Sequence, residues 1–155
     1  MAGAACAEAL REGGYDGAVT LVCREPDPPY NRPPVSKGYL ANEESREDAL
    51  VHPSEWWEEH GVDLRLRTSV MQLDTEGRLA TLSTRDELSY DMALLATGAN
   101  VRRLPADGSD LEGIHYLRAL RNADVLRDDV ADAESVVLIG GSYIGTETAA
   151  TLTKM

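Results

Sequence analysis

The chain has 155 residues, 43% hydrophobic and 27% charged, a balance typical of a soluble globular protein the size of one ordinary domain. Its formal net charge of −12 disfavours nonspecific binding to nucleic acid, whose phosphates it would repel. No apolar run approaches the roughly 20 residues that a membrane span needs, and no N-terminal signal peptide is recognisable. We therefore expect a cytoplasmic protein with no nucleic-acid and no membrane partner.

The beginning of the chain predicts a helix followed by a strand. Ala4–Arg11 contains good helix formers and is followed by two glycines that favour a helix end. Ala18–Cys23 is rich in apolar and β-branched residues and predicts a buried strand. Glu25 follows this strand, 22 residues after Gly3, which fits the spacing at which a dinucleotide fold places an acid on a ribose hydroxyl. An ordinary solvent-exposed loop acid is the alternative.

A proline-rich loop comes next. Residues 26–34 contain five prolines and predict an extended, stiff segment. Ser36 is placed to cap a short helix that runs through Leu40. Arg32 and Lys37 are the cations of this region, which fits either a ligand site or a solvent-facing loop.

The middle of the chain predicts one helix and several strands. Pro53–Gly61 has clear helix boundaries, with Ser54 as the expected N-cap. Val62–Leu66 alternates apolar and polar residues, which indicates a half-buried strand. Three more strands follow, the first two as a β-hairpin: Ser69–Asp74, Leu79–Ser83 and Leu88–Thr97.

The last part of the chain predicts a linker, a helix and a strand–turn–helix unit. Residues 100–110 are polar and contain Pro and Gly, as a crossing segment would. Ala119–Val130 is helical by composition. Ser135–Ile139 predicts a strand buried on both faces, because its apolar residues include β-branched Val and Ile. A helix is expected from Tyr143 onward.

The turn after this strand resembles the dinucleotide fingerprint G-x-G-x-x-G. Gly140 fills the first place, which makes the tight turn, and Gly145 fills the third, which allows close helix–strand packing. Ser142 occupies the second place, where a glycine lets the backbone approach a pyrophosphate. The N-terminus of the following helix would offer N–H groups and a partial positive charge to phosphates. The alternative is a glycine-rich turn of any α/β domain.

Neither the cysteines nor the histidines have the spacing of a metal or redox site. Cys6 and Cys23 fall in a predicted helix and a predicted strand, so we expect two buried thiols. His52, His60 and His115 are scattered without the spacing of zinc ligands. We therefore expect no metal site.

Three segments, in this order, resemble one enzyme superfamily. They are the P-Y-x-R-P-P-x-S-K motif at Pro29–Lys37, the segment Leu94–Ala99 and the turn Gly140–Glu147. Together they resemble the FAD-dependent pyridine nucleotide-disulfide oxidoreductases. More narrowly, the chain is similar to the NAD(P)H-dependent ferredoxin, rubredoxin and putidaredoxin reductases, which are related to apoptosis-inducing factor. The resemblance covers nearly the whole chain, which would correspond to about a third of a family member and is expected to be a fragment.

The resemblance implies an α/β fold in three parts. Residues 1–103 would form a partial Rossmann-like FAD-binding domain that lacks its first strand and carries an antiparallel β-hairpin excursion. Residues 104–134 would form a crossing segment and helix, and residues 135–155 the strand, turn and helix that begin a second Rossmann-like domain for NAD(P)H. Because a missing first strand and glycine turn would remove the main pyrophosphate site, we expect this chain alone to bind FAD weakly or not at all and to be inactive.

The resemblance also implies roles for individual residues. Glu25 corresponds to the acid that binds the adenosine ribose of FAD. Lys37 is expected near the reactive part of the flavin ring and Glu147 near the nicotinamide, which makes these two the candidate catalytic residues. The other candidate cofactor-binding residues are Gly3, Arg32, Val70, Ala96, Thr97, Gly98 and Arg103 for FAD, and Gly140, Gly141, Ser142, Tyr143, Ile144 and Gly145 for NAD(P)H.

The implied reaction is hydride transfer from NAD(P)H to FAD, followed by single-electron transfer to a small ferredoxin- or rubredoxin-type protein. The region around Lys37 lacks the redox cysteine pair of the disulfide-reducing branches. Two alternatives stay open: a nucleotide-binding module without redox turnover, and an inactive truncated fragment. The residue that separates NADH from NADPH should lie roughly 20 positions beyond the glycine turn, outside this sequence.

Overall fold

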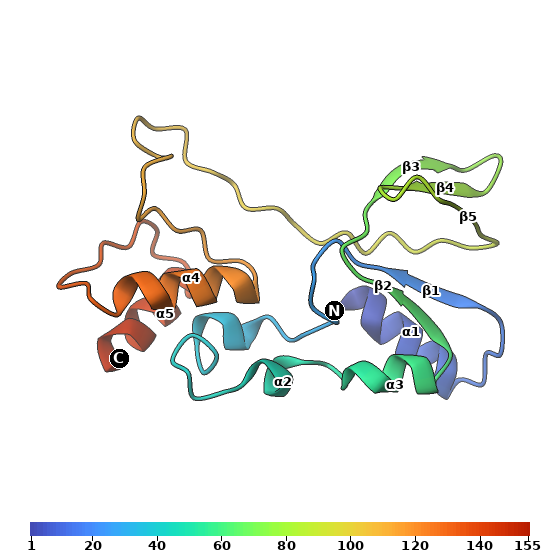
Figure 1. Ribbon diagram of the computed structural model, residues 1–155, viewed down its shortest axis with the longest axis horizontal. Helices are drawn as coiled ribbons and strands as arrows, with labels where there is room; N and C mark the ends of the chain where they lie inside the picture. The colour runs from blue at the N-terminus through green and yellow to red at the C-terminus, as the bar shows by residue number, and fades with distance from the viewer. The chain divides into compact units, whose positions relative to one another are not determined.

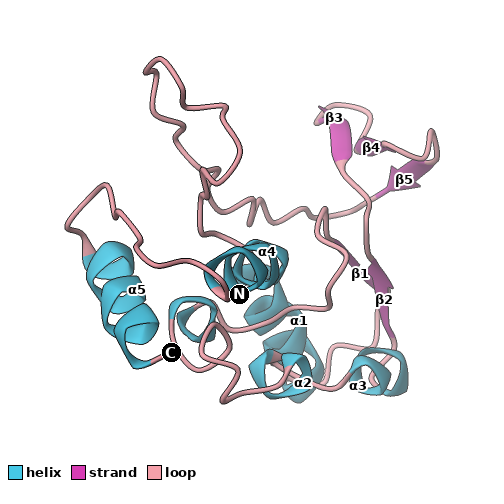
Figure 2. Ribbon diagram, turned by 60° about the vertical axis from the view of Figure 1, so that its left-hand side comes forward, coloured by secondary structure: helices cyan, strands magenta, loops and turns pink.

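The computed structural model describes all residues from Met1 to Met155 and contains helices, one parallel sheet and one antiparallel sheet (Figures 1 and 2). The chain forms two compact units. The first unit combines Met1–Tyr30 with Leu50–Thr97, and the second combines Asn31–Ala49 with Gly98–Met155. None of the helices has the length and apolar character that a membrane crossing requires.

The first unit contains a helix–strand–helix–strand succession. Its elements are α1 (Ala2–Glu12), β1 (Val19–Val22), α3 (Ser54–Glu59) and β2 (Val62–Arg65). The two strands pair in parallel, with Val19 opposite Val62. Their common core includes Trp57 and the alanines at positions 4 and 7, which are three apart and therefore share one face of α1. These elements confirm the order of helices and strands predicted for this part of the chain.

The same unit carries a three-stranded antiparallel sheet, which confirms the expected hairpin. The turn of the hairpin is held by Asp74, whose Oδ1 accepts the backbone N–H groups of Glu76 and Gly77, each at 2.9 Å. Such carboxylate–backbone bonds are a common reason for Asp in turns. The strands are β3 (Val70–Asp74), β4 (Leu79–Leu82) and β5 (Glu87–Ser89), paired in that order.

The second unit is helical. Its elements are the 3-10 helix η1 (Pro33–Ser36), the short α2 (Arg46–Ala49), α4 (Leu120–Val130) and α5 (Tyr143–Lys154). Both α4 and α5 contact η1. Leu40, Leu120 and Ala123 are fully buried and form much of its interior. The two long helices were expected from composition and from the glycine turn.

Two expected strands do not form. Leu88–Thr97 pairs only at its start, within β5, and Ser135–Ile139 has no partner strand. Their apolar side chains are therefore largely exposed, 72% for Leu95 and 85% for Val137. Apolar and β-branched composition shows that a segment suits a sheet, but a strand also needs a neighbour for its backbone N–H and C=O groups.

Smaller differences concern caps and burial. Ser54 is the first residue of α3, and the chain enters that helix through Pro53 instead. Ser36 ends η1 and caps no helix. β1 is half-buried, because β2 is its one partner in the sheet. Cys6 and Cys23 are free thiols, as expected, but both are only partly buried.

The guanidinium of Arg11 joins the end of α1 to two loops of the first unit. Its Nε donates to the His60 carbonyl and its Nη2 to the Gly61 carbonyl, both at 2.7 Å. Its Nη1 donates to the carbonyls of Tyr15 at 2.7 Å and Gly17 at 2.9 Å. The planar fork of arginine presents several donors in fixed directions, which suits this set of acceptors.

We predict that Arg11→Lys lowers the free energy of unfolding, because lysine keeps the charge but cannot reach these carbonyls together. The expected loss is about 1–2 kcal/mol, reduced from the buried case by the partial exposure of these bonds. Urea denaturation measures it, with Arg121→Lys on the exposed face of α4 as the control. Equal stability of the two variants would show that the Arg11 contacts contribute nothing.

Candidate functional site

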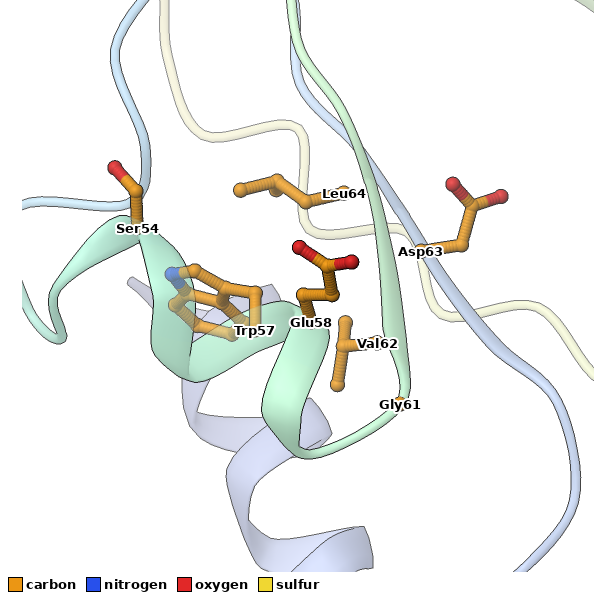
Figure 3. Close-up of a pocket in the computed structure, with 7 residues that line it drawn as sticks. All are labelled: Ser54, Trp57, Glu58, Gly61, Val62, Asp63 and Leu64. Carbon is orange, nitrogen blue, oxygen red and sulfur yellow. The ribbon is translucent and has the colours of Figure 1, made fainter.

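Two pockets differ in whether they contain candidate residues, and the larger of the two holds none of them. It is an open pocket of about 530 Å³ between α3 and β2 in the first unit (Figure 3). Its walls include Trp57, Glu58 and Leu64. The smaller pocket, about 290 Å³, lies in the second unit and is lined by both candidate catalytic residues, Lys37 and Glu147. The chemistry therefore favours the smaller pocket.

Lys37 and Glu147 form an ion pair between the end of η1 and the first turns of α5. Lys37 Nζ lies 3.0 Å from Glu147 Oε1. The other carboxylate oxygen, Oε2, accepts a hydrogen bond from Ser36 Oγ at 2.7 Å. The Ser36 hydroxyl, and after it the Lys37 ammonium, hold the pKa of Glu147 below its ordinary value. The structure thus brings together the two residues that the sequence assigned to catalysis.

Local sequence explains how η1 presents these groups. Pro33 and Pro34 stand at its first positions, where a fixed φ suits a helical turn and the missing N–H groups are not needed. The Lys37 N–H donates to the Pro34 carbonyl at 2.9 Å and closes the turn. The rigid turn therefore ends at Ser36, and Lys37 comes directly after it.

The glycine turn before α5 fits the fingerprint at its first and third places. Gly140 has φ +111°, which favours glycine, and a Cβ added to Gly145 would collide with the Gly140 carbonyl. Ser142 is the N-cap residue of α5, and its side chain makes no capping bond there. Tyr143 is 87% exposed. The expected binding residues Gly140, Gly141, Ser142, Tyr143, Ile144 and Gly145 thus form an exposed turn at a helix N-terminus.

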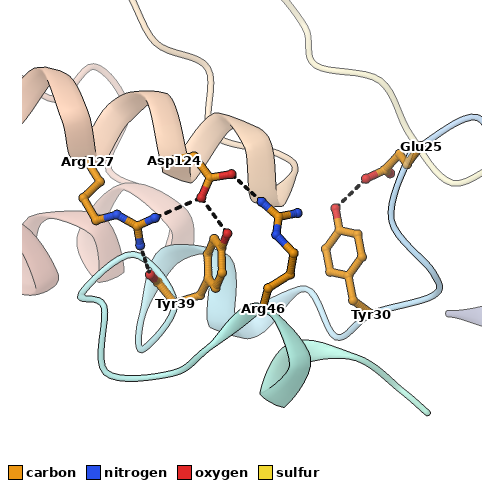
Figure 4. Close-up of polar contacts among 6 residues, drawn as sticks. All are labelled: Glu25, Tyr30, Tyr39, Arg46, Asp124 and Arg127. Atoms are coloured by element: carbon orange, nitrogen blue, oxygen red, sulfur yellow. Dashed lines mark hydrogen bonds and ion pairs between the residues drawn. The ribbon is translucent and has the colours of Figure 1, made fainter. Parts of the chain in front are cut away.

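The first unit holds Gly3 and Glu25. A Cβ added to Gly3 would lie 3.0 Å from Leu21 Cδ1 and 3.5 Å from the Ala96 Cβ, so glycine allows close packing of α1 there. No side chain caps the N-terminus of α1. Glu25 follows β1, and its Oε2 accepts a hydrogen bond from Tyr30 Oη at 2.5 Å (Figure 4).

The remaining FAD-side candidates are less clearly grouped. Arg32 Nη1 donates to the Arg118 carbonyl at 3.0 Å. Gly98 has φ +66°, and a Cβ there would lie 3.5 Å from Arg118 Nη2, so Arg32 and Gly98 share a neighbour. Arg103 packs over the Tyr116 ring, 5.2 Å from its centroid. Val70 begins β3, and Ala96 and Thr97 lie in the exposed segment that follows β5.

A charged network around Tyr39 was not foreseen from the sequence. Asp124 of α4 accepts hydrogen bonds from Tyr39 Oη and Arg46 Nη2, each at 2.5 Å, and from Arg127 Nη2 at 2.9 Å (Figure 4). Arg127 Nη1 also donates to the Tyr39 carbonyl at 2.8 Å. Burial, and after it the contact with Asp124, raises the pKa of Tyr39 above its ordinary value. The network fixes the segment that follows Lys37.

Two more residues at the site, Ser36 and Thr151, were also missed as site residues. Ser36 lies inside the P-x-S-K motif, and Thr151 lies four residues after Glu147, hence on the same face of α5. Thr151 Oγ1 donates to the Ser36 carbonyl at 2.7 Å. The spacing of Glu147 and Thr151 was the signal available in the sequence.

Comparison with known proteins identifies the family. Residues 1–155 match the pyridine nucleotide-disulphide oxidoreductase family, and the chain belongs to it. It is 39% identical over 154 residues to rhodocoxin reductase of Rhodococcus erythropolis, covering 99% of this chain and 36% of that protein. It is 38% identical over 152 residues to a ferredoxin–NAD(P)+ reductase of Sphingomonas, covering 98% of this chain and 37% of that protein.

Solved structures agree. The ferredoxin reductase for the CYP199A2 system of Rhodopseudomonas palustris has a TM-score of 0.94 and 34% identity, over 99% of this chain and 38% of that one. The reductase in the covalent putidaredoxin reductase–putidaredoxin complex has a TM-score of 0.87 and 32% identity, over 96% of this chain and 36% of that one. These matches confirm the expected family and its α/β, Rossmann-like fold. The chain spans little more than a third of the length of these relatives.

We predict that Asp124→Ala destabilises the protein, because the buried Tyr39 hydroxyl loses its acceptor and two arginines lose their carboxylate. The expected loss in free energy of unfolding is about 1–3 kcal/mol. Thermal or urea unfolding measures it. Asp128→Ala, an exposed position on the same helix, is the matched control, and an equal effect of both substitutions would contradict the role given to Asp124.

Proposed function

We propose that this chain is the flavin-side portion of an FAD-dependent NAD(P)H reductase that passes electrons to a small ferredoxin- or rubredoxin-type protein. One observation carries the proposal: the cation of the P-x-S-K motif, Lys37, pairs with Glu147 on the helix that the glycine turn opens, 3.0 Å apart. The relatives named for ferredoxin, rhodocoxin and rubredoxin reduction support the same activity.

The residues of the first unit fit FAD. The close packing at Gly3 and the uncapped N-terminus of α1 are the features that a pyrophosphate site uses, since N–H groups at a helix start favour anions. Glu25, restrained by Tyr30, would accept hydrogen bonds from the adenosine ribose. FAD supplies the chemistry of two-electron and one-electron transfer when bound.

The residues of the second unit fit NAD(P)H. The exposed turn Gly140–Gly145 and the N–H groups at the start of α5 would bind the pyrophosphate, with Ser142 adding a hydroxyl. Glu147, one turn into α5, would orient the nicotinamide end of the dinucleotide. Lys37 would place a positive charge near the flavin ring, where reduction adds negative charge. Its side chain is half exposed, so water attenuates this effect.

We also propose the division into residues 1–103 for the FAD domain, 104–134 for the crossing segment and 135–155 for the start of the NAD(P)H domain. The compact units divide the chain differently, because Asn31–Ala49 belongs with α4 and α5. A cytoplasmic location is proposed as well. The free thiols Cys6 and Cys23 are typical of a reducing compartment.

The proposal predicts a flavoprotein when the complete reading frame is expressed. Purified protein should show flavin absorbance, lose it anaerobically on addition of NADH or NADPH, and regain it when an oxidised ferredoxin or rubredoxin is supplied. Lys37→Met should slow the flavin reduction on the order of ten- to a hundredfold, because a charge beside the reacting group is lost.

Lys154→Met is the matched control, since Lys154 lines the same pocket without pairing with Glu147. If no flavin co-purifies and added FAD leaves the melting temperature unchanged, the reductase proposal fails. Flavin that binds but is not reduced by either nucleotide would favour a nucleotide-binding module without redox turnover.

A further inference from the structure

Ser36 is held by α5 at two points. Its hydroxyl donates to Glu147 Oε2 at 2.7 Å, and its carbonyl accepts from Thr151 Oγ1 at 2.7 Å. Ser36 is 5% exposed and Thr151 is 7% exposed, so the bond between them is shielded from water. The bond to Glu147, whose side chain is 30% exposed, is shielded at its Ser36 end. We call these two bonds the Ser36 contacts.

The direction of the Thr151 bond is unusual for this helix. A threonine in a helix commonly donates to the carbonyl four residues earlier, as Thr153 does to Ala149 at 2.7 Å. Thr146 likewise donates to the carbonyls of Ser142 and Tyr143. Thr151 instead donates across to η1, although a carbonyl of its own helix stands one turn away. The Thr151 hydroxyl therefore links α5 to η1 instead of bonding within its own helix.

The ion pair between Lys37 and Glu147 cannot fix its own geometry. The Lys37 side chain is 50% exposed and flexible, and partly hydrated ion pairs of this kind are weakly directional. The Ser36 contacts have less of this freedom, because Ser36 and Thr151 are buried. They fix one oxygen of the Glu147 carboxylate and the peptide that immediately precedes Lys37, which leaves Oε1 free to meet the ammonium.

We infer that Ser36 and Thr151 are positioning residues, which hold the segment before Lys37 against α5 and orient the Glu147 carboxylate. The flavin-side cation thereby keeps a fixed place relative to the helix of the NAD(P)H turn. The inference rests on the proposed function, because the position of Lys37 relative to α5 affects a reaction only if flavin and NAD(P)H bind there. The depressed pKa of Glu147 agrees with it, because the Ser36 hydroxyl is its first cause. A depressed carboxyl pKa keeps the charged pair intact above the ordinary value and loses it as the pH falls through the depressed one.

The test compares Thr151→Val with Thr153→Val in the protein expressed from its complete reading frame. Valine keeps the branched shape of threonine and removes the hydroxyl. Hydrogen exchange of the Lys37 amide, which bonds to the Pro34 carbonyl, should become about tenfold faster in Thr151→Val. Thr153→Val should leave it unchanged, and Thr151→Ser should restore protection.

Ser36→Ala provides a second, independent readout. In this variant the Glu147 carboxyl should titrate at a higher pH than in the parent protein, and ¹³C NMR over a range of pH measures the titration. In the flavin-loaded protein, both Thr151→Val and Ser36→Ala should slow reduction by NADH several-fold with the Kd for NADH unchanged. A purely structural role would instead lower thermal stability and leave this rate constant unmoved.

Two results that need no flavin overturn the inference: equal amide exchange in Thr151→Val and Thr153→Val, or an unchanged Glu147 titration in Ser36→Ala. The exchange and titration readouts need no flavin, so they decide the Ser36 contacts in a protein that holds none. Absence of flavin would then overturn the proposed function alone. A flavin that NADH reduces equally fast in all variants would overturn the positioning role and leave the proposed function intact.

Discussion

The candidate site depends on the two contacts that the Glu147 carboxylate makes. It accepts a hydrogen bond from buried Ser36 and pairs with Lys37, and these two residues stand more than a hundred positions before it in the chain. Without this carboxylate, a buried hydroxyl would lose its acceptor and a half-exposed ammonium its counter-charge. The Asp124 network of α4 binds the same segment at Tyr39. The short stretch from Ser36 to Tyr39 is thus held by two helices, which helps to make the second unit compact although it contains no sheet.

Sequence patterns predicted the elements whose stability is decided locally. The alanine face of α1, the alternation in β2 and the turn residues of the hairpin each depend on neighbours within a few positions, and all three form as expected. Leu88–Thr97 and Ser135–Ile139 fail for a different reason, since a strand is a property of two segments and composition describes only one. Hydroxyl roles were equally hard to predict. Ser54 and Ser36 both suited a helix cap, but Ser36 reaches a carboxylate that is near only in space.

For the candidate site, the resemblance proposed Lys37 and Glu147 as catalytic residues, which stays a prediction, and the folded chain places the two in contact. The motifs could not identify what surrounds them. Thr151 and Asp124 belong to no glycine turn or proline-rich segment, and their roles depend on which face of a helix meets η1 or Tyr39. Residues that bind a ligand directly leave marks in a sequence through required chemistry and spacing. Residues that hold such a ligand-binding residue in place act through packing, which a single sequence does not display.

The unpaired segment Val136–Ile139 also has a colloidal consequence. It is apolar, β-branched, free of charge and proline, and its backbone finds no strand to pair with. Segments of this composition are templates for pairing between chains and for aggregation. The opposing force is the mutual repulsion of molecules that each carry a net charge of −12. Salt shortens the range of that repulsion to about 8 Å at physiological ionic strength, so we expect isolated copies of this chain to stay apart more readily in dilute buffers than in concentrated ones.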